Sequence, residues 1–326
     1  MSTLSFTTPV EQPERVITLT PASHVLLLGS CFADHVGKHL VESMPTGHVV
    51  VNPFGPLYDA VSLCRALSMV RDDVSCALPD DTYFCGRDGL WHNWYFAGLV
   101  SAPTLEACRA EAEARLAEAH NCFRRAELIV LTLSTDHVYT LWERPGFIVA
   151  NCHKEPAARF CRETCSAERL VADWTDLLAS IGGAEGRRAQ IVFTLSPYRY
   201  TKYGLHENAL TKARLLCVID ALCGQHAHAH YFPAYEIVTD ELRDYRFYAS
   251  DMLHPSDVAV DYVWQRFREW TFSPELCDYA DRRGRLLREL AHRPLHPDSP
   301  EARRFMEERR ARWRAFEAED KKYDRH

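Results

Sequence analysis

Ser30 is the residue in this sequence that is best placed to act as a nucleophile. It ends the apolar run Val25–Ser30, where a buried strand is expected to give way to a helix. Unpaired N–H groups and the dipole at a helix N-terminus favour a developing oxyanion. Serine is also a favoured N-cap residue, so its position alone fits a purely structural role equally well.

A serine nucleophile needs a base, and the pair Asp251 and His254 can supply one. Three residues apart in a loop, the carboxylate can meet the imidazole N–H, fix the tautomer and stabilise the imidazolium. Pro255 disfavours helical geometry at the preceding His254. Taken alone, the pattern more often marks a surface Asp in a capping loop. Together with Ser30, it predicts His254 as general base and Asp251 as its orienting acid.

Alternating strands and helices must hold these residues together. Apolar runs predict strands at residues 25–30, 49–51, 127–134, 189–195 and 230–238. Helices are expected from Phe32 onward and over residues 57–70, 104–125, 168–181, 207–222 and 257–270. This alternation implies a mostly parallel sheet with helices on both faces. Ligands bind such sheets at the carboxyl ends of the strands, where Ser30 lies.

Two hairpins are expected to interrupt the α/β pattern. One turns at Asp88-Gly89 and the other at Arg144-Pro145-Gly146. In the helix over residues 207–222, one apolar face is expected to carry Leu210, Ala213, Cys217 and Ala221. The chain is expected to divide into an α/β domain, residues 1–272, and a charged helical extension, residues 273–326. Its last part, residues 301–326, is expected to be a solvated helix docked weakly on the domain, and a partner-binding or oligomerising helix is the alternative.

The composition excludes several protein classes. The 326 residues are 47% hydrophobic with few glycines, which argues against a disordered or collagen-like chain. A net charge of −7 argues against a nucleic-acid partner. The longest apolar runs are too short for a membrane span, and the N-terminus lacks the layout of a signal peptide. Twelve cysteines are therefore expected to be free thiols in the cytoplasm.

Neither a cofactor nor a metal is expected. Cys161 and Cys165, with Cys152-His153 upstream, lack the spacing of paired zinc-binding knuckles. The alternating histidines His226, His228 and His230 are better explained as solvated residues between a helix and a strand.

The stretch Gly29-Ser30-Cys31-Phe32-Ala33 resembles the signature of the GSCFA family, a branch of the SGNH (GDSL-like) hydrolase and acyltransferase superfamily. Further similar motifs lie between Leu26 and Trp264: Asn52–Gly55, Asn151–Lys154, Ser196–Arg199, Glu207-Asn208 with Lys212, and Asp251–Pro255. The resemblance implies a three-layer α/β/α sandwich of flavodoxin-like type. It also implies Ser30 as nucleophile, His254 as base and Asp251 as its acid, with the N–H groups of Ser30 and Gly55 in the oxyanion hole.

One motif departs from the superfamily. Its third block normally supplies an Asn to the oxyanion hole, but this sequence reads Ser134-Thr135-Asp136-His137. An ionised Asp136 would repel an oxyanion. Asn151 is therefore the expected third donor, because its amide carries the needed N–H groups. Asn52 and the hydroxyl of Ser134 or Thr135 are alternatives.

Three further residues are expected to contact substrate: Asn52, His153 and Arg199. Cys31 is a second nucleophilic side chain beside Ser30. It is set aside because adjacent residues point differently at such a turn and cysteine is often buried.

The expected function is a serine esterase that removes a short, acetyl-like acyl group from a carbohydrate or other hydroxylated small molecule. An O-acyltransferase that acylates a sugar hydroxyl would use the same residues. A non-catalytic glycan-binding module is the third possibility, since a fold does not fix a function. The sequence makes no prediction of oligomeric state.

Overall fold

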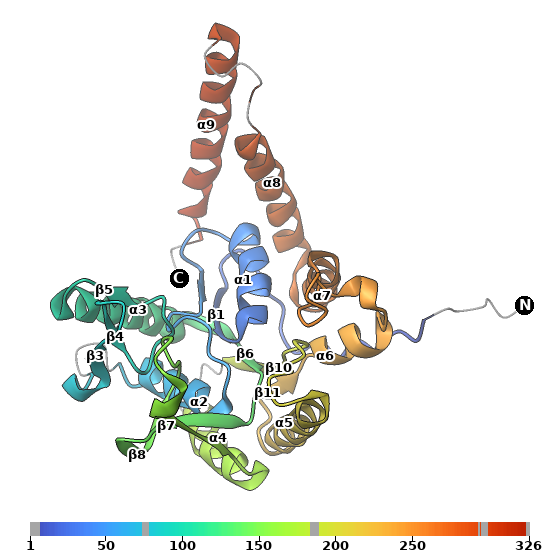
Figure 1. Ribbon diagram of the computed structural model, residues 1–326. Helices are drawn as coiled ribbons and strands as arrows, with labels where there is room; N and C mark the ends of the chain where they lie inside the picture. Colours follow the sequence, from blue (N-terminus) through green and yellow to red (C-terminus); the bar gives the residue numbers. More distant parts are fainter. Residues whose placement is uncertain (1–6, 74–77, 183–188, 293, 295–298, 324–326) are drawn as a thin grey trace, which may run out of the picture.

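A parallel sheet of five strands forms the centre of the molecule in the computed structural model (Figure 1). The model describes residues 7–73, 78–182, 189–292, 294 and 299–323. The strand order is β11-β10-β6-β1-β2, and every neighbouring pair is parallel. The strands are β1 (His24–Gly29), β2 (Val49–Val51), β6 (Ala126–Leu133), β10 (Gln190–Leu195) and β11 (Ala229–Tyr231). The sequence prediction of a mostly parallel α/β fold is confirmed.

Helices cover both faces of this sheet because its strands are apolar on both sides. In β1, Leu26 and Leu28 belong to one core, while Val25 and Leu27 belong to the other. The first core is closed by α2 (Ala60–Arg71), α3 (Leu105–Arg125), α4 (Ala167–Gly182) and α5 (Leu205–Gln225). The second is closed by α1 (Cys31–Ser43), α6 (Ala234–Glu236), α7 (Asp257–Thr271) and α8 (Pro274–Ala291).

Both expected hairpins are present, and each gains a third antiparallel strand. The first comprises β3 (Tyr83–Cys85), β4 (Trp91–Asn93) and β5 (Ser101–Ala102). The second comprises β7 (His137–Leu141), β8 (Arg144–Val149) and β9 (Phe160–Thr164). The third strands escaped prediction because β5 has only two residues and β9 is partly exposed and charged. The turn of the second hairpin was expected at Arg144-Pro145-Gly146, but these residues belong to β8. The turn lies at Trp142-Glu143.

Two details of the sequence prediction are wrong. The last strand stops at Tyr231, and a helix with a π-helical turn occupies residues 234–241. Pro233 cannot donate a ladder hydrogen bond, so it ends the strand. In α5, the residues expected on the buried face include Leu210, which is exposed, whereas Leu215 and Ile219 are buried. Apolar residues lie on both sides of this helix, so the spacing of apolar residues alone predicted the wrong face as the buried one.

The C-terminal segment is helical, as expected, and projects from the body as the pair α8 and α9 (Pro300–Asp320) (Figure 1). Tyr279 of α8 packs on Phe316 of α9 and donates a 2.6 Å hydrogen bond to Asp320. The end of α9 is therefore anchored, although most of its surface is exposed. In the described part of the chain, no helix combines the length and hydropathy needed to span a bilayer.

Candidate active site

A cavity of about 480 Å³ lies at the carboxyl end of the sheet. The lining comes from the start of α1, the segment after β2, the end of β6, the second hairpin, and the loops after β10 and before α7. Its lining residues are Cys31, Tyr58, Asp59, Ser134, Thr135, His137, Tyr139, Val149, Ala150, Asn151, Cys152, Tyr198, Tyr200, Lys202 and His254. This edge is where parallel sheets bind ligands.

His254 and Asp251 form the hydrogen-bonded pair expected from the sequence. Nδ1 of His254 lies 2.6 Å from Oδ2 of Asp251. The other carboxylate oxygen accepts the backbone N–H groups of Leu253 and His254, at 2.9 and 3.0 Å. These bonds, that from the imidazole first, lower the pKa of Asp251 to about 2. The carboxylate therefore stays ionised and can accept a hydrogen bond from Nδ1 of a ring that lines the cavity.

The loop that carries this pair is held to the end of β10. The backbone N–H of Arg199 donates to the carbonyl of Leu253 at 3.1 Å, and its guanidinium reaches the carbonyl of Met252 at 3.3 Å. The ring of the preceding Tyr198 packs on His254, with ring centroids 4.2 Å apart. Arg199 does not line the cavity. It holds the loop of His254 in place, whereas the sequence predicted contact with substrate.

Ser30 does not reach the cavity. Its exposed fraction is 0%, and its Oγ has no hydrogen-bond partner among the described residues. Its backbone N–H group donates a hydrogen bond to the carbonyl of Thr132 at 3.3 Å. The residue precedes α1 as its N-cap, but its side chain makes no capping bond. Neither the exposed nucleophile nor the side-chain cap expected at this position is present.

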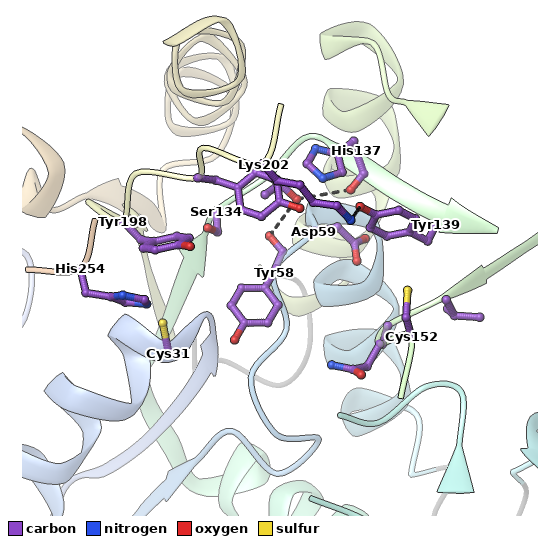
Figure 2. Close-up of a pocket in the computed structure, with 15 residues that line it drawn as sticks. Cys31, Tyr58, Asp59, Ser134, His137, Tyr139, Cys152, Tyr198, Lys202 and His254 are labelled. Atoms are coloured by element: carbon purple, nitrogen blue, oxygen red, sulfur yellow. Dashed lines mark hydrogen bonds between the residues drawn. The ribbon is translucent and has the colours of Figure 1, made fainter. Parts of the chain in front are cut away.

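Cys31 is the residue of this turn that lines the cavity. It is the first residue of α1, and Figure 2 shows its sulfur directed toward the imidazole of His254. Burial, followed by the nearby carboxylate of Asp34, raises the pKa of the thiol. The N–H groups of Cys31 and Phe32 act in the opposite direction by bonding to the thiolate. The thiol is therefore protonated at rest, and a base is needed to form the thiolate.

The two backbone donors expected for the oxyanion hole are already occupied. The N–H of Ser30 is bonded to β6, and that of Gly55 donates to the carbonyl of Asn52 at 2.7 Å. Gly55 has a φ of 73°, and a Cβ there would lie 2.7 Å from that of Ala97. This glycine is thus explained by a tight turn under the first hairpin, away from the cavity.

Asn52 fixes the turn after β1 and does not line the cavity. Its buried side chain accepts the N–H of Gly29 at 2.8 Å and donates to Asp34 at 2.6 Å. Asn52 is thus a positioning residue for the start of α1. Because it lies outside the cavity lining, it is not placed to act as the oxyanion donor or the substrate contact that the sequence allowed.

The carboxylate of Asp136 points away from the cavity. It is fully buried and accepts hydrogen bonds from Thr211, at 2.8 Å, and from the guanidinium of Arg214. Its charge is therefore neutralised on α5. Ser134, two residues earlier, does line the cavity, and its buried hydroxyl has no partner among the described residues. Among the described residues, that hydroxyl is therefore an unpaired donor at the cavity.

Asn151 lines the cavity, as does the following residue, Cys152. Oδ1 of Asn151 accepts the N–H of His153 at 2.7 Å, while the amide nitrogen of Asn151 bonds to no described residue. Figure 2 shows Cys152 across the cavity from His254. His153 turns away and packs against Trp94, and burial lowers its pKa to about 4. Asn151 can contact bound substrate, whereas His153 supports the hairpin.

Tyrosines form much of the cavity wall, which sequence reasoning missed. Tyr58, Tyr139, Tyr198 and Tyr200 all line it. Lys202 lies among them and donates to the hydroxyl of Tyr139 at 3.1 Å (Figure 2). The alternation of Tyr198, Tyr200 and Lys202 was the available signal, because alternate residues of an extended segment face one side.

Lys212 is a buried amine beneath the site, and the sequence analysis assigned it no role. It donates to the carbonyls of Ser134 and Ser196, at 3.0 and 2.8 Å, where β6 and β10 end. Burial lowers its pKa to about 7, although Cys31 and then Asp136 act in the opposite direction. The sequence did indicate this position. Lys212 precedes Leu215 by three residues and Ile219 by seven, and this helical spacing puts all three on the buried face of α5.

Comparison with protein-family models finds one match, to the GSCFA family, over residues 24–267. The match includes all five strands of the central sheet and the loop of Asp251 and His254. Comparisons with curated proteins and with solved structures find no match.

Proposed function

The chain belongs to the GSCFA family, and from that premise we propose that it is a hydrolase of acyl esters with His254 as its general base. Family membership suggests a hydrolase-like activity, and the substrate and mechanism given below are part of the proposal. The observation that carries the proposal is the hydrogen bond between His254 and Asp251 at the rim of a cavity that also opens on the start of α1. This arrangement of base, orienting acid and helix N-terminus supports an SGNH-type site.

The proposed reaction uses a nucleophile from the turn after β1, where Ser30 and Cys31 have nucleophilic side chains. Nε2 of His254 accepts the proton of the nucleophile as it attacks the ester carbonyl. The hydroxyl of Ser134 and the N-terminus of α1 stabilise the resulting oxyanion. His254 then protonates the leaving alcohol, and Asp251 stabilises the imidazolium in between. Water, deprotonated by His254, releases the acid from the acyl-enzyme.

The proposed substrate is an ester of a hydroxylated, carbohydrate-like alcohol with a small acyl group. A cavity of about 480 Å³ suits a small ligand. Its tyrosine rings can stack on the apolar face of a sugar, and Lys202 and Asn151 supply donors for hydroxyl oxygens. Lys202 and Tyr139 lie across the cavity from His254, where the alcohol portion would bind (Figure 2).

Hydrolysis is favoured over acyl transfer by the exposure of the base. The side chain of His254 is 43% exposed, so water reaches the position from which it would attack. A transferase must exclude water from its acyl-enzyme while the acceptor binds. Product analysis with a sugar acceptor present checks this point: transfer faster than hydrolysis would contradict the esterase assignment.

The test of the proposed function is turnover of p-nitrophenyl acetate by wild type and by His254→Asn. We expect hydrolysis by wild type and a loss on the order of a hundredfold or more in the variant. His292→Asn is the matched control, because His292 is exposed at the end of α8. Equal turnover by wild type and His254→Asn, or no turnover of any acyl ester by wild type, would contradict the proposal.

A further inference from the structure

We propose that the nucleophile is the thiol of Cys31 and not the hydroxyl of Ser30, so that the acyl-enzyme is a thioester. This inference rests on the proposed function, because it names the attacking atom of the same site. The two residues are adjacent in the sequence, but the fold gives them different surroundings. Cys31 lines the cavity with His254, whereas Ser30 is wholly buried outside the lining.

The geometry of the turn explains this difference. Ser30 has extended backbone angles and ends the sheet, with its N–H bonded to Thr132 of β6. Cys31 is already helical, and its side chain therefore leaves the chain in another direction. Asn52 holds the turn by accepting the N–H of Gly29 and by donating to Asp34 on α1. The thiol is thus presented by a braced helix start.

The groups around Cys31 are those that a nucleophile requires. Figure 2 shows the sulfur pointing toward the imidazole of His254. Tyr198 lies beside both residues: its ring packs on His254, and its hydroxyl is close enough to Cys31 for the thiolate to raise the pKa of that hydroxyl. The N–H groups of Cys31 and Phe32 stabilise a thiolate at the helix N-terminus. No comparable partner is available to Ser30, whose Oγ bonds to no described residue.

An oxyanion donor is also available at this end of the cavity. The hydroxyl of Ser134 is buried, with 1% of the residue exposed, and it has no partner among the described residues. Figure 2 places Ser134 on the same side of the cavity as Cys31 and His254. Beneath it, the amine of Lys212 bonds to the Ser134 carbonyl and exerts a favourable field on the thiolate. An unpaired donor beside a thiol and a base fits a carbonyl oxygen that becomes charged during attack.

The chemistry balances without an added reagent. The S–H proton of Cys31 passes to His254 Nε2 as sulfur forms a bond to the acyl carbon. The C–O bond to the alcohol then breaks, and His254 returns the proton to the departing oxygen. Water adds to the thioester carbonyl, giving its proton to His254, and the C–S bond breaks. The proton returns to sulfur, and a carboxylic acid leaves.

The experiment is trapping of the acyl-enzyme with p-nitrophenyl acetate, followed by intact-mass measurement and peptide mapping. We expect one rapidly formed acetyl adduct on Cys31, which neutral hydroxylamine removes because it cleaves thioesters and leaves oxygen esters intact. Ser30→Ala should retain the adduct and the turnover. Cys31→Ala should lose the adduct and on the order of a thousandfold or more in turnover. Cys217→Ala, at an exposed cysteine of α5, is the control for incidental acetylation.

The outcomes separate this inference from the proposed function. A hydroxylamine-resistant adduct on Ser30 that is lost in Ser30→Ala would overturn the thiol assignment and leave the esterase intact. Turnover without an adduct at Cys31 and unchanged in Cys31→Ser would also overturn it. No turnover by wild type would overturn the esterase and this inference together. The near-isosteric Cys31→Ser, checked by circular dichroism, guards against a loss caused by misfolding of the alanine variant.

Discussion

Nδ1 of His254 lies 2.6 Å from Oδ2 of Asp251, and the other oxygen of the same carboxylate accepts the backbone N–H groups of Leu253 and His254. One side chain therefore both orients the imidazole and shapes the loop that carries it. The arrangement depends on very few residues, although neither member of the pair is buried.

Asp251→Asn should lower kcat/KM on p-nitrophenyl acetate by on the order of a hundredfold to ten-thousandfold. An amide can offer its NH2 group to Nδ1, which stabilises the wrong tautomer and leaves the imidazolium without a charge partner. Steady-state kinetics check this, with Asp278→Asn on exposed α8 as the control. Retention of full activity would show that Asp251 serves only the loop.

The acid limb of the pH–rate profile should not arise from Asp251. Hydrogen bonds from the His254 imidazole and backbone hold the pKa of this carboxyl at about 2, so it stays ionised as the pH falls through the range in which esterases are assayed. Asp251→Asn should therefore lower activity at every assay pH without removing the acid limb. Loss of that limb in the variant would contradict this prediction.

Asn52→Ala should destabilise the protein by about 2–4 kcal/mol, because it strands the buried N–H of Gly29 and leaves Asp34 without its donor. Asn52 also has a φ of 43°, which alanine tolerates poorly. Comparison with Asn52→Gly separates the two causes, because glycine accepts that φ but also lacks the amide. Urea denaturation gives the free energies of unfolding. Equal stability of wild type and Asn52→Gly would show that the amide bonds contribute nothing.

Gly29→Ala should destabilise the sheet by about 1–3 kcal/mol or more. A Cβ at this position would lie 2.6 Å from both the Cβ and the carbonyl oxygen of Thr132, so β1 and β6 would have to separate. Gly98→Ala is the matched control, because a Cβ there has no neighbour within 4 Å. Thermal denaturation of both variants measures the difference, and similar shifts in Tm would refute the close-approach argument.

Lys212→Met should change the pH dependence of stability. Burial lowers the pKa of this amine to about 7 from 10.5, so between these values the unfolded chain binds more protons than the folded one. The unfolding free energy of wild type, measured relative to Lys212→Met, should therefore rise from about pH 7 to about pH 9. Lys38→Met, at an exposed position of α1, should show no such trend. A difference independent of pH would mean that the amine stays charged throughout.

The sequence predicted the sheet because each central strand is an apolar run whose alternate residues enter opposite cores. It predicted the pair His254 and Asp251 because the two residues are only three positions apart. A hydrogen bond between such close neighbours in the sequence depends little on the rest of the fold. The spacing of apolar residues could not place the buried face of α5, because both faces are apolar and a lysine, Lys212, occupies the buried one.

The remaining site residues depend on contacts between distant segments. Which of Ser30 and Cys31 faces the cavity is set by backbone angles at one turn, and those angles follow from bonds to β6 and to Asn52. The sequence predicted His153 as a substrate contact. In the structure, its ring instead packs against Phe84 and Trp94, two aromatic residues of the first hairpin. No local pattern encodes either outcome.

Cys31 and His254 come from opposite ends of the sheet-forming part of the chain. Cys31 follows the first strand of the central sheet, whereas His254 comes after β11, the last. Contacts of such long range cost more chain entropy to form than local ones, which slows the folding of structures that depend on them. A refolding chain can therefore regain its helices before it regains a working site. We expect any activity at this cavity to return during refolding only once the segments of Cys31 and His254 have come together.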